Sequence, residues 1–179
     1  MLNPKTVLDR LFRRDAPPVT PPLEPTERVV AWAPTAEAVA VASTHALWLP
    51  AKKGTEGSDW HRLGWHEIHK AVWRDEALVV TPGVEIEPGV VADGPVRRVR
   101  LPEPRDLPKE VRERVTRSVA YTEHHELGAG GGVRVLGRRV PGRDGLTWQL
   151  RFDDPADREI PAARAEAEGL LAEARATRA

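Results

Sequence analysis

The sequence contains no cysteine. This absence excludes a disulfide framework, a thiolate zinc site, an iron–sulfur cluster and a cysteine nucleophile. The chain also lacks net charge, because 27 basic and 27 acidic side chains balance. The molecule as a whole therefore gives no electrostatic reason to bind nucleic acid or an anionic membrane, and any such function must depend on a local cluster.

Long apolar runs are missing as well. No stretch approaches the roughly 20 apolar residues of a membrane span, and the N-terminus lacks the apolar core of a signal peptide. We therefore expect a cytoplasmic protein with no integral membrane segment. Only two phenylalanines and one tyrosine accompany six tryptophans, so tryptophan must supply most of the large side chains of the core.

Residues 1–26 are predicted to form an arm outside the folded body. Five prolines between residues 16 and 25 remove backbone donors and favour an extended spacer. Before them, a short amphipathic helix beginning at Asn3 and Pro4 presents four apolar side chains on one face: Val7, Leu8, Leu11 and Phe12. An apolar helix on such a tether is suited to docking a protein partner.

Residues 27–179 are predicted to form a single globular domain in two parts, 27–118 and 119–179. Alternating apolar residues before position 102 indicate up to seven strands. They lie within residues 28–34, 37–43, 45–50, 61–65 and 96–102 and in a hairpin over 69–83 that turns at Asp75 and Glu76. Residues 84–94 carry no clear strand pattern.

Helices are predicted after these strands. Leu107, Val111 and Val115 are four residues apart and indicate a helix near 106–117, with Asp106 as its N-cap. Three further strands are expected within 118–127, 133–140 and 146–152, followed by a C-terminal helix from about 161 anchored by Leu170 and Leu171. The predicted fold is α+β: a mostly antiparallel barrel or sandwich, a mid-chain helix, a three-stranded meander and a C-terminal helix.

Large apolar residues follow one another in a set order: Trp60, Leu63, Trp65, Ile68, Trp73, Leu78 and Val80. Together with the preceding strand pair "AVASTHALWLP", this order resembles the bacterial pleckstrin-homology-like domains over residues 28–118. The resemblance implies a partly open barrel or sandwich closed by the mid-chain helix, and a scaffold used for binding that has no common catalytic residues. The part from Ser118 onward resembles small uncharacterised proteins of high-GC actinobacteria.

Histidines are concentrated in two places. His61, His66 and His69 lie close together, but alternation along a strand sends His66 and His69 to opposite faces. In "EHHE", residues 123–126, at most two side chains can share a face. Because a zinc site needs three or four converging ligands, we expect no metal, cofactor or catalytic set here. A metal-dependent enzyme using clustered histidines, His124 and His125 included, remains an alternative.

The basic residues give the second alternative. Between positions 97 and 143 there are twelve Arg or Lys and six Asp or Glu. Four arginines in and after the predicted strand 133–140 form a candidate site for phosphate or nucleic acid: Arg134, Arg138, Arg139 and Arg143. The last three surround an expected turn and have no nearby acid until Asp144. The helical arginines alternate with glutamates, which is typical of a solvated face. The leading hypothesis is a noncatalytic interaction module.

Overall fold

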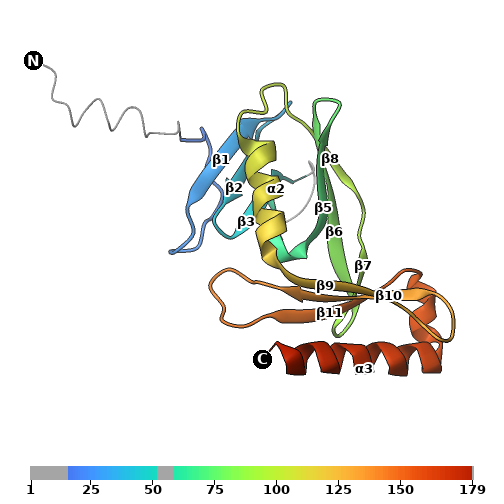
Figure 1. Cartoon of the computed structure of the whole chain (residues 1–179). Helices are drawn as coiled ribbons and strands as arrows, with labels where there is room; N and C mark the ends of the chain where they lie inside the picture. Colours follow the sequence, from blue (N-terminus) through green and yellow to red (C-terminus); the bar gives the residue numbers. More distant parts are fainter. Residues whose placement is uncertain (1–15, 52–58, 179) are drawn as a thin grey trace, which may run out of the picture.

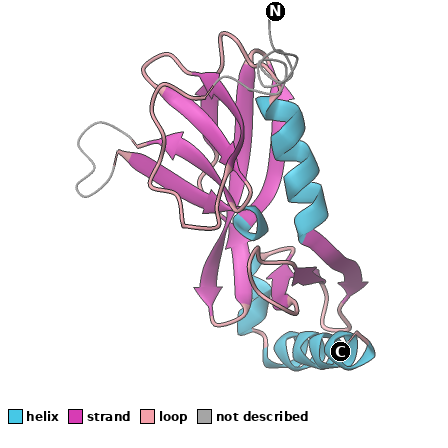
Figure 2. Cartoon of the chain, turned by 90° about the vertical axis from the view of Figure 1, so that its left-hand side faces the viewer, coloured by secondary structure: helices cyan, strands magenta, loops and turns pink. Residues whose placement is uncertain are grey.

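The computed structural model describes residues 16–51 and 59–178. Within these ranges the chain folds into an α+β structure with two sheets and two α-helices (Figures 1 and 2). The predicted docking residues Val7, Leu8, Leu11 and Phe12 lie outside the described residues, so their role remains a prediction. No helix of the described residues is long and apolar enough to cross a membrane.

The first sheet is a four-stranded antiparallel meander. Its strands are β1 (Val29–Pro34), β2 (Val39–Ser43), β3 (Ala46–Pro50) and β4 (Trp60–Gly64). All five residues of β2 are buried, because both faces of the strand are covered. Ala40 and Ala42 face the central core, whereas Val39 and Val41 pack with Trp48 and Leu23 on the outer face.

The proline-rich segment provides the cover for this outer face. It contains no helix or strand, in keeping with its prolines, but it does not stand away from the body. Pro17 and Pro21 are buried, and Leu23 packs against the outer apolar cluster of the first sheet. The packed body therefore reaches back before Glu27, the predicted start of the folded part.

The second sheet has seven strands in the order β5-β6-β7-β11-β10-β9, with β8 paired to the first half of β6. All pairs are antiparallel except β7 with β11. The strands are β5 (Ile68–Arg74), β6 (Ala77–Glu87), β7 (Val90–Asp93), β8 (Arg97–Arg100), β9 (Val119–Glu126), β10 (Gly132–Arg138) and β11 (Thr147–Phe152). Strand β6 joins the two parts of the chain, because its first half pairs with β5 and β8 and its second half pairs with β7.

The second half of β6 and the whole of β7 were not predicted. Pro82 and Gly83 suggest a break, yet both residues lie inside β6. Pro82 still contributes through its carbonyl oxygen, which accepts a hydrogen bond from the amide of Gly94 at 2.7 Å. Gly83 lies against the ring of His69, where an added Cβ would stand 2.2 Å from Nε2. The glycine is needed for this contact and does not end the strand.

Helix α2 (Leu107–Ser118) closes the core between the first sheet and the strands β5, β6 and β8 (Figure 1). Leu107 and Val111 are fully buried in that core, which confirms the predicted periodicity. Asp106 precedes the helix as predicted, but its side chain makes no capping hydrogen bond.

Helix α3 (Pro161–Thr177) packs on the part of the second sheet formed by β7, β10 and β11. Its buried contacts come from Ala163, Ala167 and Ala174. Leu170 and Leu171, the predicted anchors, are only partly buried at the edge of this cluster. The small alanines let the helix lie close to the sheet.

The hairpin turn is confirmed. Asp75 and Glu76 both have positive φ angles, 49° and 55°, as a two-residue type I′ turn requires. Trp73 beside the turn pairs with buried Leu78 and so lies on the core side of β5, but 39% of it is exposed. Trp65 and Ile68 are buried as predicted.

Candidate functional site

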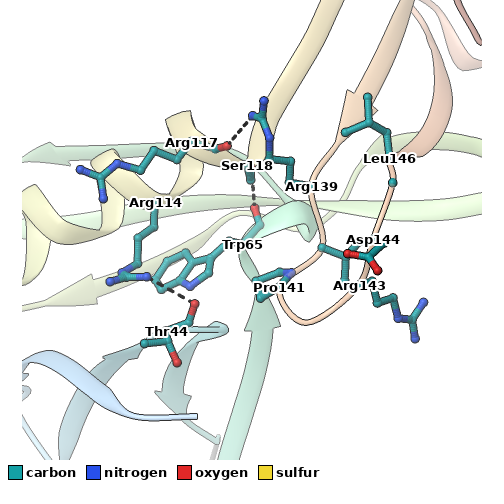
Figure 3. A pocket seen from close by; sticks show the side chains of 12 residues that line it. Thr44, Trp65, Arg114, Arg117, Ser118, Arg139, Pro141, Arg143, Asp144 and Leu146 are labelled. Atoms are coloured by element: carbon teal, nitrogen blue, oxygen red, sulfur yellow. Dashed lines mark hydrogen bonds between the residues drawn. The ribbon is translucent and has the colours of Figure 1, made fainter. Parts of the chain in front are cut away.

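A cavity of about 540 Å³ opens where the end of α2 meets the loop between β10 and β11 (Figure 3). We name it the arginine cleft after its wall, which contains four arginines and one aspartate. Its lining residues are Thr44, Trp65, Arg114, Arg117, Ser118, Arg139, Val140, Pro141 and residues 143–146.

The β10–β11 loop is shaped by its own sequence. In the turn 140–143 the amide of Arg143 donates to the carbonyl of Val140 at 3.1 Å, with Pro141 and Gly142 at the two central positions. Gly142 has a φ of 75°, which a type II turn requires at this place. Proline fixes one central residue and glycine permits the other, so the chain presents Arg139 and Arg143 from a defined turn.

Two of the four arginines are neutralised by α2 itself. Arg114 lies 2.8 Å from Glu110 and also donates to the carbonyl of Thr44. Arg117 lies 3.4 Å from Glu113. Both are pairs of residues four apart on one helix, as the alternating sequence predicts.

The other two arginines have no carboxylate partner among the described residues. Arg139 donates to the carbonyls of Arg117 and Val119, at 3.1 and 3.5 Å, where its cation offsets the negative end of the helix dipole. The side chain of Arg143 makes no hydrogen bond or ion pair within the described part of the chain, and Figure 3 shows its guanidinium directed away from the groups around Trp65. These two charges are therefore available to an anion.

Arg138 adds a buried charge behind the cleft. Only 4% of it is exposed, and its Nη1 donates to the hydroxyl of Ser118, a lining residue, at 2.9 Å. Its Nη2 donates to the carbonyl of Ile68 at 3.3 Å, while Nε has no partner among the described residues. Burial lowers the pKa of Arg138, and nearby Arg151 lowers it further. Even so, an arginine remains charged.

The predicted basic site is thus only partly brought together. Arg139 and Arg143 line the cleft, Arg138 lies behind it, and Arg134 is not among the lining residues. Arg134 pairs with His124 in the sheet, away from the loop. Arg114 and Arg117 were not predicted, because their alternation with glutamate gives no sign that their helix ends beside the loop at residues 139–146.

A second pocket, of about 370 Å³, shares Val140 and Arg143 with the arginine cleft. We name it the histidine pocket, because His66 and His69 both line it. The prediction that these two imidazoles face apart is wrong. His66 belongs to a 3-10 turn, η1 (Trp65–Glu67), and the register of β5 shifts at His69, so simple alternation does not apply. The other lining residues are Glu67, Gly83, Glu85, Gly89, Val91 and residues 147–149.

His69 is fixed in place. Its Nδ1 lies 2.8 Å from Asp93, whose other oxygen accepts from Arg151 at 2.7 Å. Burial lowers the pKa of His69 and outweighs the opposite effect of the Asp93 hydrogen bond. The lowered pKa favours the neutral imidazole, and its contact with Asp93 joins β5 to β7.

The remaining predicted histidines are dispersed. His61 lies on β4, opposite Leu49. His124 contacts Asp153 at 2.8 Å, and His125 lies on the other face of β9 in a small pocket with Tyr121. The two faces of residues 123–126 are therefore divided as predicted, and the histidine pocket brings together His66 and His69 but not these three residues.

One group of possible metal ligands was not predicted. Glu24, Glu27 and His45 place ligand atoms within 4.8 Å of one another, the only such group among the residues that the structure describes. The carboxylate of Glu27 already accepts hydrogen bonds from the Ser43 hydroxyl, the Trp48 indole at 2.9 Å and the Glu24 amide at 3.1 Å. These contacts account for Glu27 as an internal anchor of the first sheet.

The function of the chain is inferred from the geometry of the site. No protein-family model, curated protein or solved structure matches the chain.

Proposed function

We propose that this protein is a noncatalytic binding module that holds a phosphate-bearing ligand in the arginine cleft. One observation carries the proposal: Arg139 and Arg143 line the cavity without a carboxylate partner among the described residues. A charged guanidinium binds phosphate oxygens through paired hydrogen bonds, and such charge-assisted bonds are stronger than neutral ones.

The surroundings of the cleft support the same ligand class. The cavity volume of about 540 Å³ lies within the roughly 300 to 1,000 Å³ of small-molecule sites. Arg138, buried behind Ser118, adds a positive charge in a region where water screens it poorly. A bound anion would compensate charges that the described residues leave uncompensated.

The arrangement of the first part of the chain supports a binding role. A four-stranded meander, the strands β5, β6 and β8, and then α2 follow the order that a pleckstrin-homology-like domain implies. We propose such a body over residues 28–118, with β7 inserted between β6 and β8. Scaffolds of this kind carry function in grafted sites, and here the site would lie at the C-terminal end of α2.

The test is calorimetric titration of the full chain with inorganic pyrophosphate. We expect one saturable site whose affinity falls steeply as salt is added, because the contacts are ionic. Arg143→Gln should weaken binding by about tenfold or more, since a hydrogen bond to a charged group contributes about 1.5–3 kcal/mol. Arg134→Gln is the matched control, because Arg134 lies outside the cleft, and its affinity should equal that of the wild type.

Three results would contradict the proposal: no binding at low salt, an affinity insensitive to salt, or equal losses in the two variants. Single-stranded DNA is titrated in parallel. If DNA binds and pyrophosphate does not compete with it, nucleic-acid binding replaces the small phosphate-bearing ligand.

A further inference from the structure

His66 lines the histidine pocket, which adjoins the arginine cleft through Val140 and Arg143. Its Nδ1 is buried and has no hydrogen-bond partner among the described residues. A buried polar atom without a partner is costly, so a change that gives this ring a partner is favoured.

The charges around His66 come from several elements. Arg62 of β4, Arg138 of β10 and Arg143 of the loop are close enough to disfavour a proton on the ring, whereas Glu67 of the same turn favours one. Burial is the largest influence, and the pKa of His66 lies below its ordinary value. The neutral form of His66 is therefore favoured, and Arg143 contributes to this preference.

Glu67 is the acid whose charge favours a proton on His66. Its Oε2 and Nδ1 of His66 each lie 2.9 Å from the position that a Cβ on Gly64 would take, so both atoms gather beside the same glycine. The same Oε2 accepts from the Gly64 amide at 2.6 Å. Within the pocket, Glu85 is bound to the Gly89 amide and His69 to Asp93, so neither one competes for His66.

We propose that the histidine pocket is a second contact region for the phosphate-bearing ligand, in which His66 takes a proton from solvent and donates a hydrogen bond to the anion held by Arg143. The anion removes the repulsion between Arg143 and an imidazolium, and protonation gives the ring two N–H donors, one of them for the ligand. This inference rests on the proposed function. Its consequence is proton-linked binding that tightens as the pH falls.

The direct test follows the His66 ring by NMR between about pH 5 and pH 8, with and without saturating pyrophosphate. The resonance is assigned with His66→Asn. We expect the ligand to raise the His66 titration midpoint. Affinity should therefore increase as the pH is lowered, by at most about tenfold per pH unit for one proton. A ring titration reports on the imidazole itself, whereas the change of affinity with pH also contains the ligand's own ionisation.

Two variants sharpen the result. In Arg143→Gln the ligand should leave the midpoint almost unchanged, whereas in Arg134→Gln the full upward shift should remain. If pyrophosphate binds the wild type and the His66 midpoint does not rise, this inference is wrong and the proposed function stands. If pyrophosphate does not bind at all, both are wrong.

Discussion

Arg138 affects both the stability of the fold and the proposed binding of phosphate. It is buried without a carboxylate partner among the described residues, and an unpaired buried cation is costly to desolvate. Its hydrogen bonds to Ser118 and Ile68 hold β10 against α2 and β5 and offset part of that cost. Methionine is nearly as long and carries no charge, so it separates the two roles.

We expect Arg138→Met to keep the free energy of unfolding within about 1 kcal/mol of the wild type, because lost hydrogen bonds are offset by relief from desolvation. Its affinity for pyrophosphate should fall several-fold, because the positive charge behind the cleft is gone. Arg138→Ala, which leaves a cavity, should lose about 3 kcal/mol.

Urea unfolding followed by tryptophan fluorescence, together with calorimetric titration, measures both quantities for these variants. An Arg138→Met protein with unchanged pyrophosphate affinity would show that the buried charge does not act on the cleft.

Glu27 is the corresponding buried anion. Burial alone would raise its pKa, but hydrogen bonds from Ser43, Trp48 and the Glu24 amide lower it below the ordinary 4.5. A lowered carboxyl pKa stabilises the fold above the unfolded-state value, and this contribution is lost as the pH falls through the folded-state value.

We expect Glu27→Gln to lose about 1–3 kcal/mol of unfolding free energy at pH 7, because the amide cannot accept from all these donors. The difference from the wild type should shrink as the pH falls below about 4.5, where Glu27 of the unfolded chain takes up a proton first, and should be smallest below the lower folded-state pKa, where the native carboxyl is protonated as well. Thermal unfolding between neutral and acid pH measures this convergence. Glu159→Gln, on the surface after β11, is the control, and a constant gap at all pH values would contradict the argument.

At the scale of elements, the sequence predicts those helices and turns whose formation depends on residues close together in the chain. The spacing of Leu107 and Val111 gives α2, and the Asp75–Glu76 turn gives the hairpin of β5 and β6, because both depend on neighbouring residues. The extension of β6 escapes prediction. Pro82 is tolerated because it pairs with Ile68, next to the register shift of β5. This shift belongs to the partner strand and cannot be predicted from the sequence around Pro82.

The register shift in β5 also determines which histidines line the histidine pocket. A 3-10 turn at Trp65 and a register shift at His69 place two imidazoles in one pocket that alternation would separate. The arginines of the loop could be predicted from their sequence, since no acid lies between Glu126 and Asp144. Their approach to Arg114 and Arg117 could not, because it depends on how the β10–β11 loop folds back on α2.

At the scale of the whole molecule, the cleft lies at the junction of two apolar clusters. One cluster fills the space between the first sheet, β5, β6, β8 and α2, and the other lies under α3. Strand β6 passes between them, and the hydrogen bonds of Arg138 tie β10 to the first cluster's walls. A ligand in the cleft would therefore contact both parts of the chain.

The central claim is that this junction binds a phosphate group. The most direct measurement is a crystal structure of the full chain with pyrophosphate. The predicted result is phosphate density within hydrogen-bonding distance of the Arg139 or Arg143 guanidinium, beside Ser118. Density confined to the arginines of β8, or to Arg134 outside the cleft, would contradict it.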